Sequence, residues 1–206
     1  TWHAAVIFKP VANGTLYLAY GTGFDPTFDA GTVGTALSTS PTQANYINLK
    51  PEESSNLELG TKWTLLEERL ALNAAVFRME KKNVRTRTGT TDAFILDGEQ
   101  QVQGIELSAS GMISTAWSIF GGVSYVDSEY KQSLSSLEQR QELLLVPDVS
   151  VSLWTTYVLP FGLTVGLGAQ YTDDVVRTRT TALGEVVLPD YVLFDAMASY
   201  QLNDFV

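Results

Sequence analysis

Apolar and polar residues alternate along most of the chain. One clear example runs from Asn56 to Trp63. Its apolar positions are Leu57, Leu59, Thr61 and Trp63, and its polar positions are Asn56, Glu58, Gly60 and Lys62. A period of two places these two sets on opposite faces of a β-strand. The same pattern predicts about nine strands, near residues 2–9, 15–23, 56–63, 69–78, 101–110, 117–125, 149–159, 163–171 and 191–200.

The connections between these strands alternate in length. Short turns near residues 12, 67, 113, 161 and 203 alternate with long polar segments near residues 37, 90, 138 and 181. Outer-membrane barrels have short turns on one side and long loops on the other, whereas soluble sandwiches have turns at about 8–12-residue spacing. Aromatic residues gather near the predicted strand ends, as interfacial girdles require: Trp2, Trp63, Trp117, Tyr157, Tyr171, Tyr191 and Tyr200. The pattern therefore predicts an all-β chain that forms an antiparallel transmembrane β-barrel.

About nine strands do not close a barrel by themselves. Single-chain bacterial barrels have even numbers of strands. An open sheet in lipid would leave unpaired N–H and C=O groups at each edge, at a cost of several kcal/mol per group. The sequence also begins at Thr1 and ends with the two strand-like residues Phe205 and Val206. We therefore expect the chain to be a piece of a larger barrel.

Composition narrows the classes of function. Of the 206 residues, 45% are hydrophobic and 17% are charged, and no run of 18 apolar residues predicts a membrane-spanning helix. The net charge of −10 disfavours nucleic-acid binding, which needs a basic surface that follows the phosphates. Cysteine is absent and His3 is the one histidine. Disulfides, thiolate sites and Cys/His clusters are therefore excluded, and we expect no metal site and no cofactor.

Several stretches resemble one known family, the TonB-dependent outer-membrane siderophore receptors. Residues 49–63, LKPEESSNLELGTKW, are similar to a signature of that family. Further similar stretches follow the same order as in the family, at residues 1–27, 74–88 (AAVFRMEKKNVRTRT), 96–111 (LDGEQQVQGIELSASG), 117–130, 146–159 and 188–204. The resemblance covers nearly the whole chain. Within the family, the sequence is most similar to the catecholate-type receptors.

The resemblance implies a plugged barrel of about 22 strands in the bacterial outer membrane. Residues 1–206 would be a portion from the C-terminal half of that barrel, without the plug and the final strands. The transported ligand would be a ferric siderophore, and energy would come from the TonB complex through the plug. The receptor would act as a monomer in contact with outer-membrane lipid and lipopolysaccharide. On the polar face, Glu58, Lys62, Glu106 and Asp195 would contact the plug or water.

Candidate ligand-binding residues lie in the long polar segments. Arg85 and Arg87 fall in one segment, and Arg177 and Arg179 fall in another. Ferric catecholates are anionic, and an arginine can donate forked hydrogen bonds to such oxygen ligands. Tyr46 and Phe94 are candidates to stack on a catechol ring. Phosphate contacts to lipopolysaccharide, or ion pairs between strands, are the alternative roles of these arginines.

The sequence does not indicate an enzyme. It contains no Ser-His-Asp set beyond His3 and no glycine-rich nucleotide motif. Paired carboxylates fall at strand ends or turns, namely Glu52-Glu53, Glu67-Glu68 and Asp173-Asp174. Three other readings stay open: a passive porin-like barrel, a soluble β-sandwich that binds a ligand, and an outer-membrane enzyme.

Overall fold

The structure, a computed structural model, describes residues 1–25, 51–87, 94–200 and 202. For residues 85–87 and 94–97 it describes the backbone alone. Eleven β-strands run through these ranges, and no helix in them is long and apolar enough to cross a membrane. The strands are β1 (Trp2–Val11), β2 (Gly14–Asp25), β3 (Glu52–Leu65), β4 (Leu70–Arg87), β5 (Phe94–Met112), β6 (Trp117–Gln132), β7 (Val149–Val158), β8 (Leu163–Thr172), β9 (Val175–Thr180), β10 (Gly184–Leu188) and β11 (Tyr191–Tyr200).

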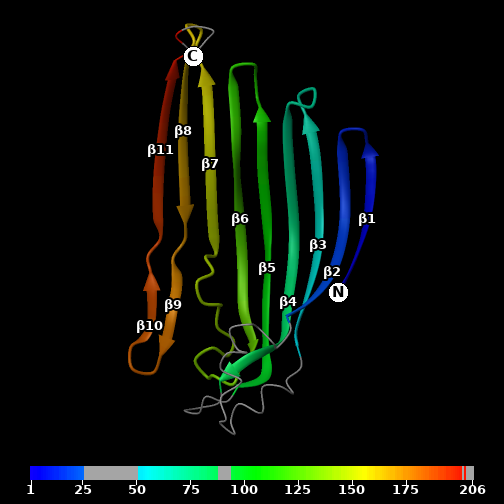
Figure 1. Cartoon of the computed structure of the whole chain (residues 1–206), viewed down its shortest axis with the longest axis vertical. Coiled ribbons are helices and arrows are strands. Elements are labelled where there is room, and N and C mark those ends of the chain that lie inside the picture. Colours follow the sequence, from blue (N-terminus) through cyan, green and yellow to red (C-terminus); the bar gives the residue numbers. More distant parts are fainter. Residues whose placement is uncertain (26–50, 88–93, 201, 203–206) are drawn as a thin grey trace, which may run out of the picture.

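Nine of the strands form one antiparallel sheet, in the order β1-β2-β3-β4-β5-β6-β7-β8-β11 (Figure 1). These are the nine strands that the alternating pattern predicts. Because β8 pairs directly with β11, the β9–β10 hairpin between them forms a separate two-stranded sheet. Residues 173–188 were predicted to be a polar loop. The hairpin forms there because β9 and β10 carry paired β-branched valines and Gly184 (φ 68°) closes the turn.

The register gives the main sheet two different faces. One row of directly paired residues crosses seven strands and is entirely apolar: Val6, Leu18, Leu59, Val76, Ile105, Tyr125 and Val149. A row on the opposite face is mostly polar or small: Tyr17, Gly60, Ala75, Glu106, Ser124, Ser150 and Thr172. We call these the apolar face and the polar face.

Nothing within the described residues covers the apolar face. Val176 is the one buried apolar side chain in that part of the chain, and it belongs to the β9–β10 hairpin. Leu59 and Ile105, in the apolar row, are 54% and 48% exposed. A continuous exposed apolar surface over so many strands is suited to lipid and not to water. This arrangement argues against the soluble sandwich, whose apolar face packs on a second sheet.

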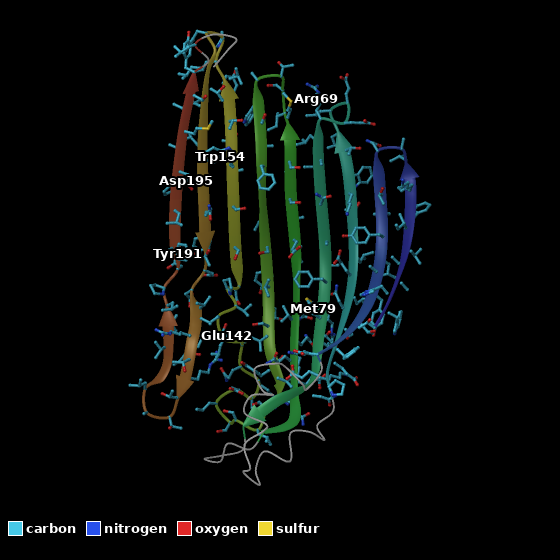
Figure 2. The ribbon with its side chains drawn as sticks, in the orientation of Figure 1. Arg69, Met79, Glu142, Trp154, Tyr191 and Asp195 are labelled. Atoms are coloured by element: carbon cyan, nitrogen blue, oxygen red, sulfur yellow. The ribbon has the colours of Figure 1, made fainter. Side chains whose placement is uncertain are left out.

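The two ends of the sheet differ in the length of their connections (Figure 1). The short connections lie together at one end, at residues 12–13, 66–69, 113–116 and 159–162. At the opposite end lie the segments 133–148 and 173–190, together with the strand ends at Asp25, Glu52, Arg87 and Phe94. Figure 2 shows Arg69 near the first end and Glu142 near the second. Long loops of outer-membrane barrels face the cell exterior, so the second end is the extracellular one.

Candidate functional site

Three side chains from β2 and β3 interact on the polar face. Tyr17 Oη donates a 2.6 Å hydrogen bond to Glu58 Oε1, and Lys62 Nζ lies 5.4 Å from the centre of the Tyr17 ring. The ring lies over Gly60, where a Cβ atom would come within 2.3 Å of Tyr17 Oη. Gly60 therefore gives the tyrosine room to reach its acid partner across the strand pair.

A hollow of about 590 Å³ extends from this cluster across the polar face as far as β8. Hydroxyl and amide side chains make up much of its wall, namely Asn73, Ser108, Ser124, Ser150, Ser152, Gln170 and Thr172. Asn73 Nδ2 donates a 3.1 Å hydrogen bond to Ser108 Oγ on the next strand. Small hydroxylated side chains keep this wall shallow and wettable, as the lumen side of a barrel requires.

A tryptophan interrupts the small polar wall nearer the end with the short connections. Trp154 of β7 lies over two glycines of β8, because Cβ atoms at Gly166 and Gly168 would come within 2.8 Å and 2.7 Å of its ring. Its cross-strand partner on β6 is Phe120, which is exposed on the same face. In the strand order, Asp195 of β11 lies directly beyond Gly168 (Figure 2). The polar face thus carries an aromatic pair, Phe120 and Trp154, in addition to the cluster of Tyr17, Glu58 and Lys62.

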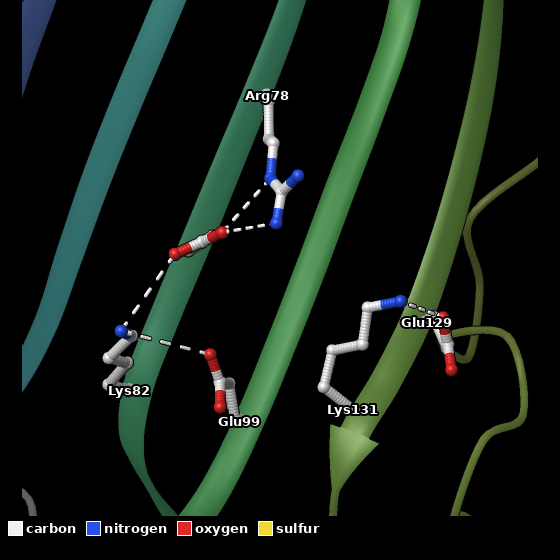
Figure 3. Close-up of polar contacts among 6 residues, drawn as sticks. Arg78, Lys82, Glu99, Glu129 and Lys131 are labelled. Carbon is white, nitrogen blue, oxygen red and sulfur yellow. Dashed lines mark hydrogen bonds and ion pairs between the residues drawn. The ribbon is translucent and has the colours of Figure 1, made fainter.

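The apolar face ends in a band of charged side chains at the extracellular end (Figure 3). Arg78 continues the row of Leu72, Ala74 and Val76 on β4 and binds Glu80 at 2.6 Å. Lys82 lies 3.9 Å from both Glu80 and Glu99. Further along the band, Lys131 pairs with Glu129 on β6. The change from aliphatic to paired charged residues marks the edge of the hydrocarbon region on these strands.

The β9–β10 hairpin packs against the segment 133–148. Arg179 Nε lies 2.7 Å from Glu185 Oε1 across the hairpin, and its Nη1 donates a 2.7 Å hydrogen bond to the backbone oxygen of Glu142. The Arg179 side chain is 7% exposed. Ion pairing between strands was one of the roles considered for this arginine. Ligand contact through Arg179 would first require its release from these partners.

The structure separates the predicted ligand-binding residues into two places. Arg85 and Arg87 lie at the end of β4, where their Cα partners on β5 are Leu96 and Phe94. The side chains of Arg85, Arg87 and Phe94, and all of Tyr46, lie outside the described part of the structure. Arg177 and Arg179 lie on β9, in the separate β9–β10 sheet, which extends from the same end of the main sheet (Figure 1). Their role in ligand binding stays a prediction.

The sequence alone did not single out Tyr17 or the pair of Phe120 and Trp154. Tyr17 and Glu58 are 41 residues apart, and the β2–β3 register brings them together. The available sequence signal was the glycine at position 60 between two charged residues of one face. In the described ranges, no three His, Asp or Glu side chains gather closely enough to hold a metal ion.

The segment 133–148 should be held more tightly at pH 5 than at pH 7. Burial and then the charge of Asp148 raise the pKa of Glu142, although Arg179 opposes this effect. Burial and then the charge of Asp173 raise the pKa of Asp148. The ordinary pKa is 4.5 for Glu142 and 3.8 for Asp148. At a pH between each ordinary pKa and its raised value, the folded state therefore binds more protons than the unfolded state. Stability rises as pH falls through that window.

Amide hydrogen exchange measures this effect after correction for the intrinsic pH dependence of exchange. We expect slower exchange at residues 141–148 at pH 5 than at pH 7. The turn at residues 159–162 serves as the control, because it contains no carboxylate and lies at the opposite end of the sheet. Faster exchange of residues 141–148 at pH 5 than at pH 7 would contradict the raised pKa values of Glu142 and Asp148.

Comparison with known proteins places the chain in a family. A family model described as "TonB dependent receptor-like, beta-barrel" matches residues 1–206. The siderophore receptor PiuA of Acinetobacter baumannii is 36% identical over 217 residues, which cover 98% of this chain and 28% of PiuA. The chain thus spans little more than a quarter of the length of this relative.

Solved structures agree in fold and in sequence. The closed form of the ferric-catecholate import receptor Fiu from Escherichia coli K12 matches with a TM-score of 0.84 and 28% identity, over 98% of this chain and 29% of Fiu. The crystal structure of PiuA matches with a TM-score of 0.81 and 33% identity, over 98% of this chain and 29% of PiuA. Residues 1–206 therefore belong to the β-barrel family of the TonB-dependent receptors of the bacterial outer membrane.

Proposed function

We propose that residues 1–206 form part of the barrel wall of a longer outer-membrane receptor that imports a ferric siderophore of the catecholate type. The observation that carries this proposal is the collinear similarity of the whole chain to PiuA and Fiu, which are named as siderophore or ferric-catecholate receptors. The polar face would line the lumen, where a plug domain outside these residues would contact Tyr17, Glu58 and Lys62. The plug would transmit energy from TonB.

The charges at the extracellular end support particular roles within this proposal. Arg177 is exposed and makes no ion pair with any residue in the described ranges, so its guanidinium can meet an anionic ferric complex. Arg85, Arg87, Phe94 and Tyr46 complete the proposed ligand-contacting set. Arg78, Lys82 and Lys131, at the edge of the apolar face, would meet phosphates of lipopolysaccharide in the outer leaflet. The receptor acts as a monomer and carries out transport without catalysis.

Uptake of labelled iron tests the proposed function directly. Cells that lack other catecholate receptors should accumulate iron from a ferric tris-catecholate when they express the full receptor, and a protonophore should abolish the uptake. A neutral ferric trihydroxamate of similar size is the matched control ligand. Uptake of the trihydroxamate alone would reject the catecholate assignment. Uptake that persists with the protonophore would instead support the passive porin-like barrel.

A further inference from the structure

The segment 133–148 and the β9–β10 hairpin make direct contact although they are far apart in sequence. Leu145 N donates a 2.9 Å hydrogen bond to the backbone oxygen of Val176 on β9. Val176 is 5% exposed, in a molecule whose other described apolar side chains are not buried. The hairpin and the segment therefore share a small buried interface at the extracellular end of the sheet.

Arg179 joins three pieces of chain at this interface. Its Nε contacts Glu185 on β10, its Nη1 contacts the carbonyl oxygen of Glu142, and its Nη2 lies 3.5 Å from Glu142 Oε1. A planar guanidinium can serve these directions at once, whereas a lysine ammonium is a single point of charge. Arg179 lies closer to the backbone oxygen of Glu142 (2.7 Å) than to its carboxylate (3.5 Å), so the Glu142 side chain contributes less to the contact than the Glu142 backbone does.

A β-bulge makes this double contact possible. Val186 pairs with Thr178 and Val187 pairs with Val176, so the register skips Arg177. In a regular strand, residues 176 and 179 would face opposite sides. The extra residue shifts the alternation, and both Val176 and Arg179 become buried while Arg177 is left exposed.

The segment 133–148 is also tied to the main sheet. Tyr130 N of β6 donates to Gln141 O, and Arg140 N donates to Tyr130 O, at 2.8 and 2.9 Å. Leu143 N donates to the hydroxyl of Ser128, which is 5% exposed. The segment thus lies between β6 on one side and the hairpin on the other.

We propose that the segment 133–148 and the β9–β10 hairpin form one cooperative extracellular unit, and that Arg179 is the latch that makes them open and close together. A ligand or partner that contacts either element then acts on both. The latch involves only residues 133–148 and the β9–β10 hairpin, and its action does not depend on which ligand the receptor transports.

Hydrogen exchange in the full receptor, in detergent or in outer-membrane vesicles, tests the latch. Arg179→Gln should raise the exchange rate of the Leu145 and Leu143 amides by about tenfold to a hundredfold, because a charged hydrogen bond contributes about 1.5–3 kcal/mol. The Arg179→Lys variant should also raise it, since the charge is kept and the fork is lost. The amides of β7 and β8 report whether the sheet itself stays folded.

Two further variants make the test specific. Glu142→Gln keeps the carbonyl partner and should change exchange by less than about threefold. Arg140→Gln removes an exposed positive charge from the same segment and should change nothing at Leu145. The proposal is overturned if Arg179→Gln loosens the hairpin but leaves Leu145 and Leu143 protected, or if Arg140→Gln has the same effect as Arg179→Gln.

Discussion

Leu107→Lys should destabilise the folded barrel by about 2–4 kcal/mol, the cost of a lysine on the lipid side near the middle of a bilayer. Leu107 lies on the apolar face of β5 and is 50% exposed. Ile105 and Ala109 flank it on that face, and the charged band does not begin until beyond Ile105. Urea titration of the receptor folded into phospholipid vesicles measures the change in free energy of unfolding.

The neighbouring residue provides the matched control. Ser108 follows Leu107 directly and lies on the polar face, where it accepts the hydrogen bond from Asn73. Ser108→Lys should cost no more than about 1 kcal/mol, the value of that hydrogen bond. If Leu107→Lys and Ser108→Lys lowered the free energy of unfolding equally, the apolar face would not be in contact with lipid.

Gly111→Ala should cost about 3 kcal/mol or more and should slow assembly of the barrel. Gly111 has a φ of 132°, which residues with a side chain rarely adopt. A Cβ atom there would lie 2.0 Å from the backbone oxygen of Arg69 and 3.0 Å from the Cα of Leu70. The Arg69 oxygen already accepts a 2.8 Å hydrogen bond from Met112 N, so it cannot move away freely. Strain and overpacking therefore add together.

Gly184→Ala separates the two contributions. Gly184 also has a positive φ, of 68°, but no atom lies within 4 Å of the place where its Cβ would be. This variant should cost about 1 kcal/mol, from backbone strain alone. Urea titration and the amount of folded receptor in the outer membrane measure both variants. A Gly111→Ala variant as stable as Gly184→Ala would show that the turn at residues 113–116 can shift away from Arg69.

Much of the fold could be predicted because its signals are local. The alternation from Asn56 to Trp63 predicts a strand, and β3 spans Glu52–Leu65 with the same residues on each face. The lengths of the connections predict which ends of the strands lie together. Both signals depend on residues close in sequence, since the pleat has a period of two and a short turn forces its strands to pair.

The candidate site could be predicted less well. The sequence indicated that Glu58, Lys62 and Glu106 share a polar face, and all three line the hollow there. It treated Arg177 and Arg179 as an equivalent pair, because both fall in the same long polar segment. The bulge at Arg177 depends on how β10 pairs with β9, and no pattern within the Arg177–Arg179 stretch indicates it.

The sequence by itself determined that this protein is an antiparallel sheet with one apolar face, since alternation and turn residues act over a few positions. Only the tertiary structure decided that Tyr17 reaches Glu58, that Trp154 lies on Gly166 and Gly168, and that Arg179 is bound to Glu142 and Glu185. Each of these contacts depends on the register between strands or on the packing of a distant segment. Register is set by the sum of many pairings along two strands, so no short stretch of sequence contains it.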